Sequence, residues 1–84
     1  MLYPLLSLKK ILEWEDSAER LGVSKVARSR RGFLTAYKRG ELNENWLKKR
    51  ENFIKRHMIQ FRKNPTIRRY IALIMWGYDP NLTK

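Results

Sequence analysis

The chain has 84 residues, of which 19 are Lys or Arg, 8 are Asp or Glu and none is Cys. This length allows one small hydrophobic core, and hence a single domain over residues 1–84, because short chains remove a smaller fraction of their surface from water. An apolar share of 43% excludes a disordered basic tail, and the absence of cysteine excludes a disulfide framework. We therefore expect a folded, intracellular protein.

The first predicted helix runs from Leu8 to Leu21, with Ser7 as its cap and Gly22 as its stop. Its apolar residues recur at steps of three and four, as expected for a helix that packs one face on a core. They are Ile11, Trp14, Ala18 and Leu21.

The segment from Val23 to Asn43 predicts two short helical pieces. Ser24 can cap a first turn that reaches Ala27, and Gly32 interrupts the pattern. Gly40 closes the second piece.

An amphipathic helix from Trp46 to Lys63 follows, opened by Asn43 or Asn45. Arg50 falls on its apolar side, where we expect the guanidinium to lie against Trp46 and to reach a carboxylate.

The last predicted helix, Ile67 to Trp76, is capped by Thr66 and is apolar nearly all round, so it should be the most buried element. Its apolar run from Tyr70 is too short to cross a bilayer. At the other end of the chain, Lys9 and Lys10 follow the apolar opening instead of preceding it, which is not the pattern of a signal peptide. No alternating strand pattern occurs, so the sequence predicts an all-α bundle of four to five short helices.

The positive charge is concentrated after residue 21. Residues 1–21 hold three basic and four acidic residues, whereas residues 22–84 hold sixteen basic and four acidic ones, a net charge of +12. Such a density favours a polyanionic partner, and nucleic acid is the commonest one. We expect DNA or RNA to be bound mainly through phosphates, by ten cations of the middle segment and of the basic helix face. These are Lys25, Arg28, Arg30, Arg31, Lys38, Arg39, Lys48, Lys49, Lys55 and Arg56.

Two features beside these cations leave alternatives open. Phe33 and Tyr37 could stack on unpaired bases or pack into the core. Arg68 and Arg69 stand in the first turn of the last helix, where the helix dipole disfavours cations. They form either an anion pocket or internal ion pairs. The candidate partners for such pairs are Glu15, Glu19, Glu41, Glu44 and Glu51.

The residues from Ala18 through Gly22 and Val23 to Ser24 resemble the turn of a helix-turn-helix motif. The resemblance implies that Lys25, Arg28, Arg30 and Arg31 meet DNA. The chain departs from that family at Arg28, where the family has an apolar anchor, and at Gly32, which would interrupt the recognition helix.

Several short strings between Ser24 and Pro80 carry a second resemblance. They are Val26-Ala27-Arg28-Ser29 with Gly32-Phe33, Lys49-Arg50 with Phe53-Ile54 and Arg56-His57, Pro65-Thr66 with Arg68-Arg69, and Ala72-Leu73-Ile74 with Trp76. They resemble small basic proteins encoded by bacteriophages, of unassigned function. The resemblance implies a viral setting, hence the host cytoplasm, and assigns no functional residues.

Catalysis is not expected. The lone His57 lies in the apolar half of its helix without a nearby acid to orient it, so we expect a partly buried structural histidine. One His, no Cys and scattered acids offer no recognisable metal site, and the four glycines are too far apart for a phosphate-binding loop, so no cofactor is expected. The alternatives to nucleic-acid binding are an interaction protein or inhibitor that binds an acidic surface of a host protein, and a structural virion component.

Overall fold

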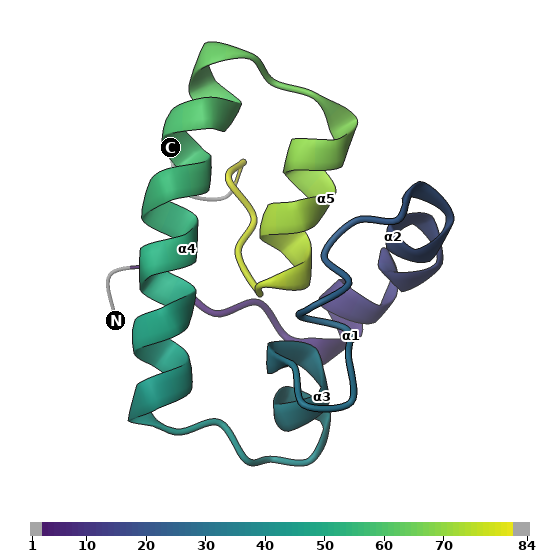
Figure 1. Cartoon of the computed structure of the whole chain (residues 1–84), viewed down its shortest axis with the longest axis vertical. Helices are drawn as coiled ribbons and strands as arrows, with labels where there is room; N and C mark the ends of the chain where they lie inside the picture. Colours follow the sequence, from purple (N-terminus) through teal and green to yellow (C-terminus); the bar gives the residue numbers. More distant parts are fainter. Residues whose placement is uncertain (1–2, 82–84) are drawn as a thin grey trace.

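A computed structural model describes residues 3–81, and within this range all regular structure is helical. The elements are α1 (Leu8–Leu12), α2 (Glu15–Leu21), α3 (Phe33–Lys38), α4 (Glu44–Lys63) and α5 (Ile67–Met75). α4 forms one side of the molecule, α5 lies beside it in the middle, and α1 to α3 lie around the other side and the end (Figure 1). The prediction of a small all-α bundle is confirmed. No helix within residues 3–81 is long and apolar enough to cross a membrane.

The predicted helix from residue 8 to residue 21 is two helices. Its ends are as expected: the Ser7 Oγ accepts a hydrogen bond from the Lys10 amide at 3.3 Å, and Gly22 ends α2 in the left-handed conformation. The break falls at Glu13 and Trp14, where the Trp14 amide donates to the Ile11 carbonyl at 3.0 Å, one residue closer than in an α-helix. The Trp14 ring packs edge-on against Tyr70 of α5, 5.4 Å between centroids, and no local pattern predicts that contact.

Of the two helical pieces predicted between residues 23 and 43, only the second forms. It is α3, which is followed by Gly40 at a φ of 69°. Residues 25–32 make turns, and Ser24 has a φ of 55° instead of the extended geometry of a helix cap. The helix-turn-helix resemblance therefore stops at the turn, because no second helix follows α2 directly.

Gly32 fixes the path of this loop. A Cβ at Gly32 would lie 2.1 Å from the carbonyl oxygen of Val26 and 2.4 Å from that of Ala27. The close approach lets the Leu34 amide donate to the Ala27 carbonyl at 2.9 Å, which joins the loop to α3. Any larger residue would separate these two backbone segments.

α4 and α5 are the two main helices of the core. α4 begins two residues earlier than predicted, because the Asn43 Oδ1 accepts a hydrogen bond from the Trp46 amide at 3.0 Å. Thr66 caps α5 in the same way, through the Arg69 amide at 3.2 Å. The last helix, predicted to be the most buried element, is buried only in its second half: residues 73–78 are all buried, whereas Ile67 and Arg68 at its start are exposed.

Arg50 is fully buried at the centre of the molecule. Its Nε donates to the Trp76 carbonyl at 2.8 Å, and its terminal nitrogens donate to the carbonyls of Tyr3 at 2.8 Å, Pro4 at 3.0 Å and Gly77 at 2.9 Å. Where the sequence predicted a carboxylate, these hydrogen bonds go to main-chain oxygens. Burial lowers the pKa of Arg50, yet a guanidinium keeps its proton in proteins. Arg50 thus joins α4 to the segments before α1 and after α5.

Candidate nucleic-acid interface

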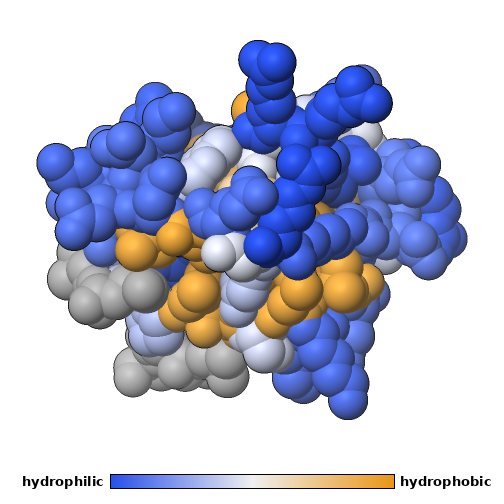
Figure 2. Space-filling view, turned by 90° about the horizontal axis from the view of Figure 1, so that it is seen from below, coloured by the Kyte–Doolittle hydropathy of each residue, from blue (hydrophilic) through white to orange (hydrophobic). Residues whose placement is uncertain are grey.

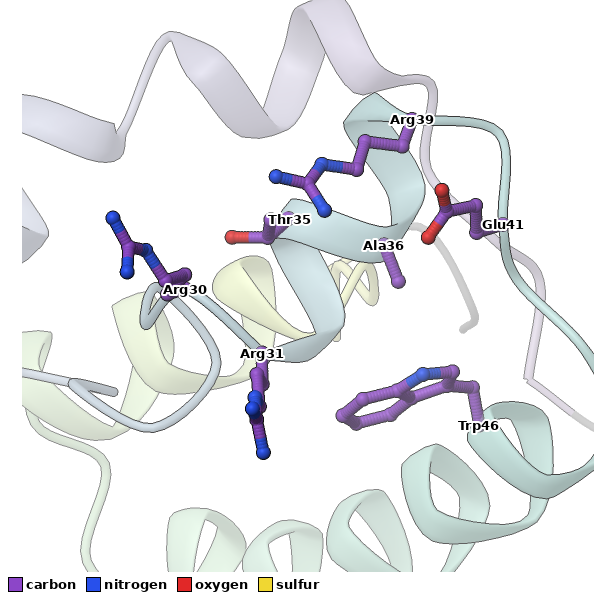
Figure 3. Close-up of a pocket in the computed structure, with 8 residues that line it drawn as sticks. Arg30, Arg31, Thr35, Ala36, Arg39, Glu41 and Trp46 are labelled. Atoms are coloured by element: carbon purple, nitrogen blue, oxygen red, sulfur yellow. The ribbon is translucent and has the colours of Figure 1, made fainter.

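A cleft of about 220 Å³ opens between α3 and the first turn of α4. Arg30 and Arg31 reach it from the turn before α3, Arg39 from the end of α3, and Trp46 from α4 on the opposite side (Figure 3). Thr35 on α3 and Glu41 in the following loop complete its polar lining. Three cations that the sequence named for phosphate contact, Arg30, Arg31 and Arg39, thus line one opening.

Hydrogen bonds hold the frame of the cleft in place. The Thr35 hydroxyl donates to the Ser29 carbonyl at 2.6 Å, and the Ser29 hydroxyl donates to the Val26 carbonyl at 2.6 Å. After α3, the Glu41 amide donates to the Ala36 carbonyl at 2.8 Å. The turn that carries the arginines is therefore tied to α3 by side-chain as well as main-chain contacts.

The charged groups around the cleft are not used internally. Within residues 3–81, the guanidinium groups of Arg30, Arg31 and Arg39 and the carboxylate of Glu41 take part in no hydrogen bond or ion pair. With three guanidinium groups and one carboxylate, the lining of the cleft has a net positive charge. A guanidinium can donate two parallel hydrogen bonds to two oxygens of one phosphate. Chemically, the cleft is suited to holding phosphate groups at the surface.

Trp46 adds an aromatic wall to the cleft. Its ring is half-buried, meets Phe33 edge-on at 6.4 Å, and has the Lys49 ammonium 5.0 Å from its centroid. The sequence indicated Trp46 only as a packing surface for Arg50 and Glu41 only as an ion-pair partner, and it did not single out Thr35. The two aromatics that it did consider for stacking on bases, Phe33 and Tyr37, belong to the core. Phe33 is fully buried, and the Tyr37 hydroxyl donates to the Leu6 carbonyl at 2.7 Å.

Two of the predicted contact residues are engaged inside the protein. Arg28 is half-buried, and its guanidinium donates to the carbonyl of Val23 at 3.0 Å and to that of Ala18 at 3.4 Å. Lys38 forms an ion pair of 2.9 Å with Glu15 of α2. Arg28 thus serves the end of α2, and the expected role in DNA contact fits it poorly.

The other predicted cations are exposed. Lys48, Lys49, Lys55 and Arg56 lie along the outer face of α4, where Lys55 and Arg56 border a shallow hollow, and Lys25 lies in the loop after α2. Figure 2 looks at the end of the molecule that carries α3 and the start of α4, and hydrophilic side chains cover its upper part and its sides. A cationic surface therefore extends beyond the cleft.

Arg68 and Arg69 each donate to a helix end. An Arg68 terminal nitrogen lies 2.6 Å from the carbonyl oxygen of Leu21, the last residue of α2. An Arg69 terminal nitrogen lies 2.6 Å from the carbonyl oxygen of Asn64, which follows α4. These contacts explain two cations at the start of α5, because the C-terminal ends of α2 and α4 carry partial negative charge. Within residues 3–81, neither arginine pairs with a glutamate.

His57 is half-buried, as expected, and its ring stacks on Phe53 with 3.9 Å between centroids. Burial, and then the charges of Arg56 and Arg69, lower the pKa of His57. No group of three or more His, Asp or Glu residues within residues 3–81 could hold a metal ion. Comparisons with protein-family models, curated proteins and solved structures found no match to this chain.

Proposed function

We propose that the protein binds DNA or RNA through the phosphate backbone, with the cleft beside α3 as the centre of the interface. One observation carries the proposal: Arg30, Arg31 and Arg39 line one opening, and none of their guanidinium groups is used by the described part of the protein. The chain's formal net charge of +11 supplies long-range attraction to a polyanion.

Contacts of this type fix the position of a protein on nucleic acid without reading its sequence. We therefore expect modest sequence specificity and a steep loss of affinity as salt rises. Each phosphate contact contributes about 0.9 to the log–log salt slope on duplex DNA. Replacing both Arg30 and Arg31 with Ala should thus lower the affinity and flatten the slope by about 1.8.

The experiment is fluorescence anisotropy with labelled duplex DNA, single-stranded DNA and RNA across a salt series. Lys9→Ala/Lys10→Ala is the matched control, because it removes the same charge from exposed positions on α1. Binding that persists near physiological salt, with a slope flattened by the Arg30/Arg31 variant and not by the control, supports the proposal. Equal salt slopes for the two double variants would show that the cleft does not contact nucleic acid. Loss of all binding at physiological salt would refute nucleic acid as the partner.

A further inference from the structure

A second groove lies between the loop after α2, the middle of α4 and α5. It consists of two hollows of about 470 and 250 Å³, and both are lined by Gly22, Ser24, His57 and Ala72. The larger hollow is apolar, with Val26, Ala27, Phe53 and Trp76 in its wall. The smaller hollow has a mixed lining, and its polar end contains Gln60, Arg68 and Arg69. The shared residues make these hollows one groove with two chemically different ends.

The ordinarily charged side chains that line this groove are all basic. Lys25 lines the apolar hollow, Arg68 and Arg69 line the smaller one, and no acidic side chain lines either of them. The hydrogen bonds of Arg68 to Leu21 and of Arg69 to Asn64 hold the two guanidinium groups in position. Each of these hydrogen bonds uses one of the five N–H donors of its guanidinium, so donors remain for an anion. The polar end is thus suited to carboxylate or phosphate oxygens.

At the apolar end, Val26 is 73% exposed and lines the hollow together with Ala27, Phe53 and Trp76. A ligand that covers Val26 and fills the hollow would remove this surface from water. The phenyl and indole rings that line the hollow offer no open face to a nucleobase. Phe53 is stacked between His57, at 3.9 Å, and Trp76, at 4.7 Å, and Trp76 itself is only 8% exposed. This end therefore fits an apolar side chain better than a base.

Ser24 stands where the two hollows meet. It is the one non-glycine residue among those described with a positive φ, 55°, and its hydroxyl oxygen is buried without a hydrogen-bond partner. Strained residues and unsatisfied buried groups are costly, and they concentrate at sites where a ligand binds.

We propose that this groove binds an acidic peptide segment of another protein, with one apolar anchor residue. The anchor occupies the hollow beside Val26, and carboxylates on the same segment meet Lys25, Arg68 and Arg69. A single well-packed anchor surrounded by complementary charge is a common way for a small interface to obtain its affinity. This groove shares no lining residue with the cleft beside α3, so the proposal does not rest on nucleic-acid binding.

The test uses two labelled twelve-residue peptides of equal charge. In one, a central phenylalanine is flanked on both sides by aspartates and glutamates, and in the other, serine replaces the phenylalanine. Fluorescence anisotropy should show the phenylalanine peptide binding about tenfold more tightly, because burial of one apolar side chain is worth at least that factor. Equal affinity of the two peptides, or no binding of either one, would overturn the proposal.

A pair of protein variants locates the effect. Val26→Ser should abolish the difference between the peptides, whereas Ile59→Ser should preserve it, because Ile59 is 58% exposed on α4 and does not line the groove. Both residues are exposed, so neither change should unfold the protein, and thermal melts verify this. If Val26→Ser and Ile59→Ser both abolished the difference in affinity between the peptides, the phenylalanine would not bind in this groove. If Val26→Ser weakens binding of a single-stranded oligonucleotide and leaves the peptides unaffected, nucleic acid is the occupant and the proposal fails.

Discussion

Replacement of Arg50 by Met should cost about 2–4 kcal/mol of the free energy of unfolding. Of its four described acceptors, the Trp76 and Gly77 carbonyls lie in fully buried hydrogen bonds, and the Gly77 carbonyl also accepts from the Leu6 amide at 2.8 Å. Loss of its partner costs the Trp76 carbonyl about 1–3 kcal/mol, and loss of the hydrogen bond from the charged guanidinium to Gly77 costs about 1.5–3 kcal/mol, so the two losses together come to about 2.5–6 kcal/mol. Removal of the desolvated charge returns part of that sum, which gives the lower net figure. A domain of 84 residues has about 4–13 kcal/mol in total, so the variant should be marginally stable.

Urea denaturation followed by circular dichroism and by tryptophan fluorescence measures this loss. Lys48→Met is the matched control, because it makes a comparable chemical change at an exposed position of the same helix. Arg50→Lys tests the geometry: one ammonium cannot reach acceptors on both chain segments, so retention of the charge should not restore stability. If Arg50→Met were as stable as Lys48→Met, the guanidinium would not be what joins these segments.

Two further predictions concern the loop before α3 and the pH dependence of stability. Gly32→Ala should cost more than about 2 kcal/mol in the same denaturation assay, because the new methyl meets the Val26 carbonyl, whereas Gly40→Ala, with open space around it, should cost only about 1 kcal/mol for its positive φ. The pKa of His57 is lower in the folded protein than in the unfolded chain, so the unfolded chain binds the proton more readily. The contribution of neutral His57 to the free energy of unfolding is therefore present above pH ~6.5 and is lost as the pH falls. Thermal midpoints between pH 7.5 and 5.5 should therefore fall less in His57→Gln than in the unchanged protein, and parallel curves would contradict the reasoning.

Local signals predicted the helices, and non-local contacts explain the differences. Ser7, Asn43 and Thr66 cap helices through amides three residues away, so the sequence contains all that is needed to recognise them. The break at Trp14 and the turns before Gly32 depend on Tyr70 and on backbone contacts within the loop, which no periodicity encodes.

The candidate site was predictable in its charge and not in its geometry. Composition identified the cations, but the carbonyl partners of Arg28 and Arg68 are set by the packing of the loop and of α5 against the end of α2. Trp46 reaches the cleft from α4, whereas Arg39 follows α3, so the participation of Trp46 depends on how α3 and α4 meet.

The position of Arg50 in the chain has a consequence for the order of folding. Its described acceptors lie 46 and 47 residues before it and 26 and 27 residues after it. Contacts between residues so far apart form late, because long loops must close first. On a ribosome, α4 can form its own hydrogen bonds well before residue 77 has emerged, but its buried arginine must stay hydrated until then. We expect the nascent chain to remain loosely packed until residue 77 has emerged, and then to fold in one cooperative step.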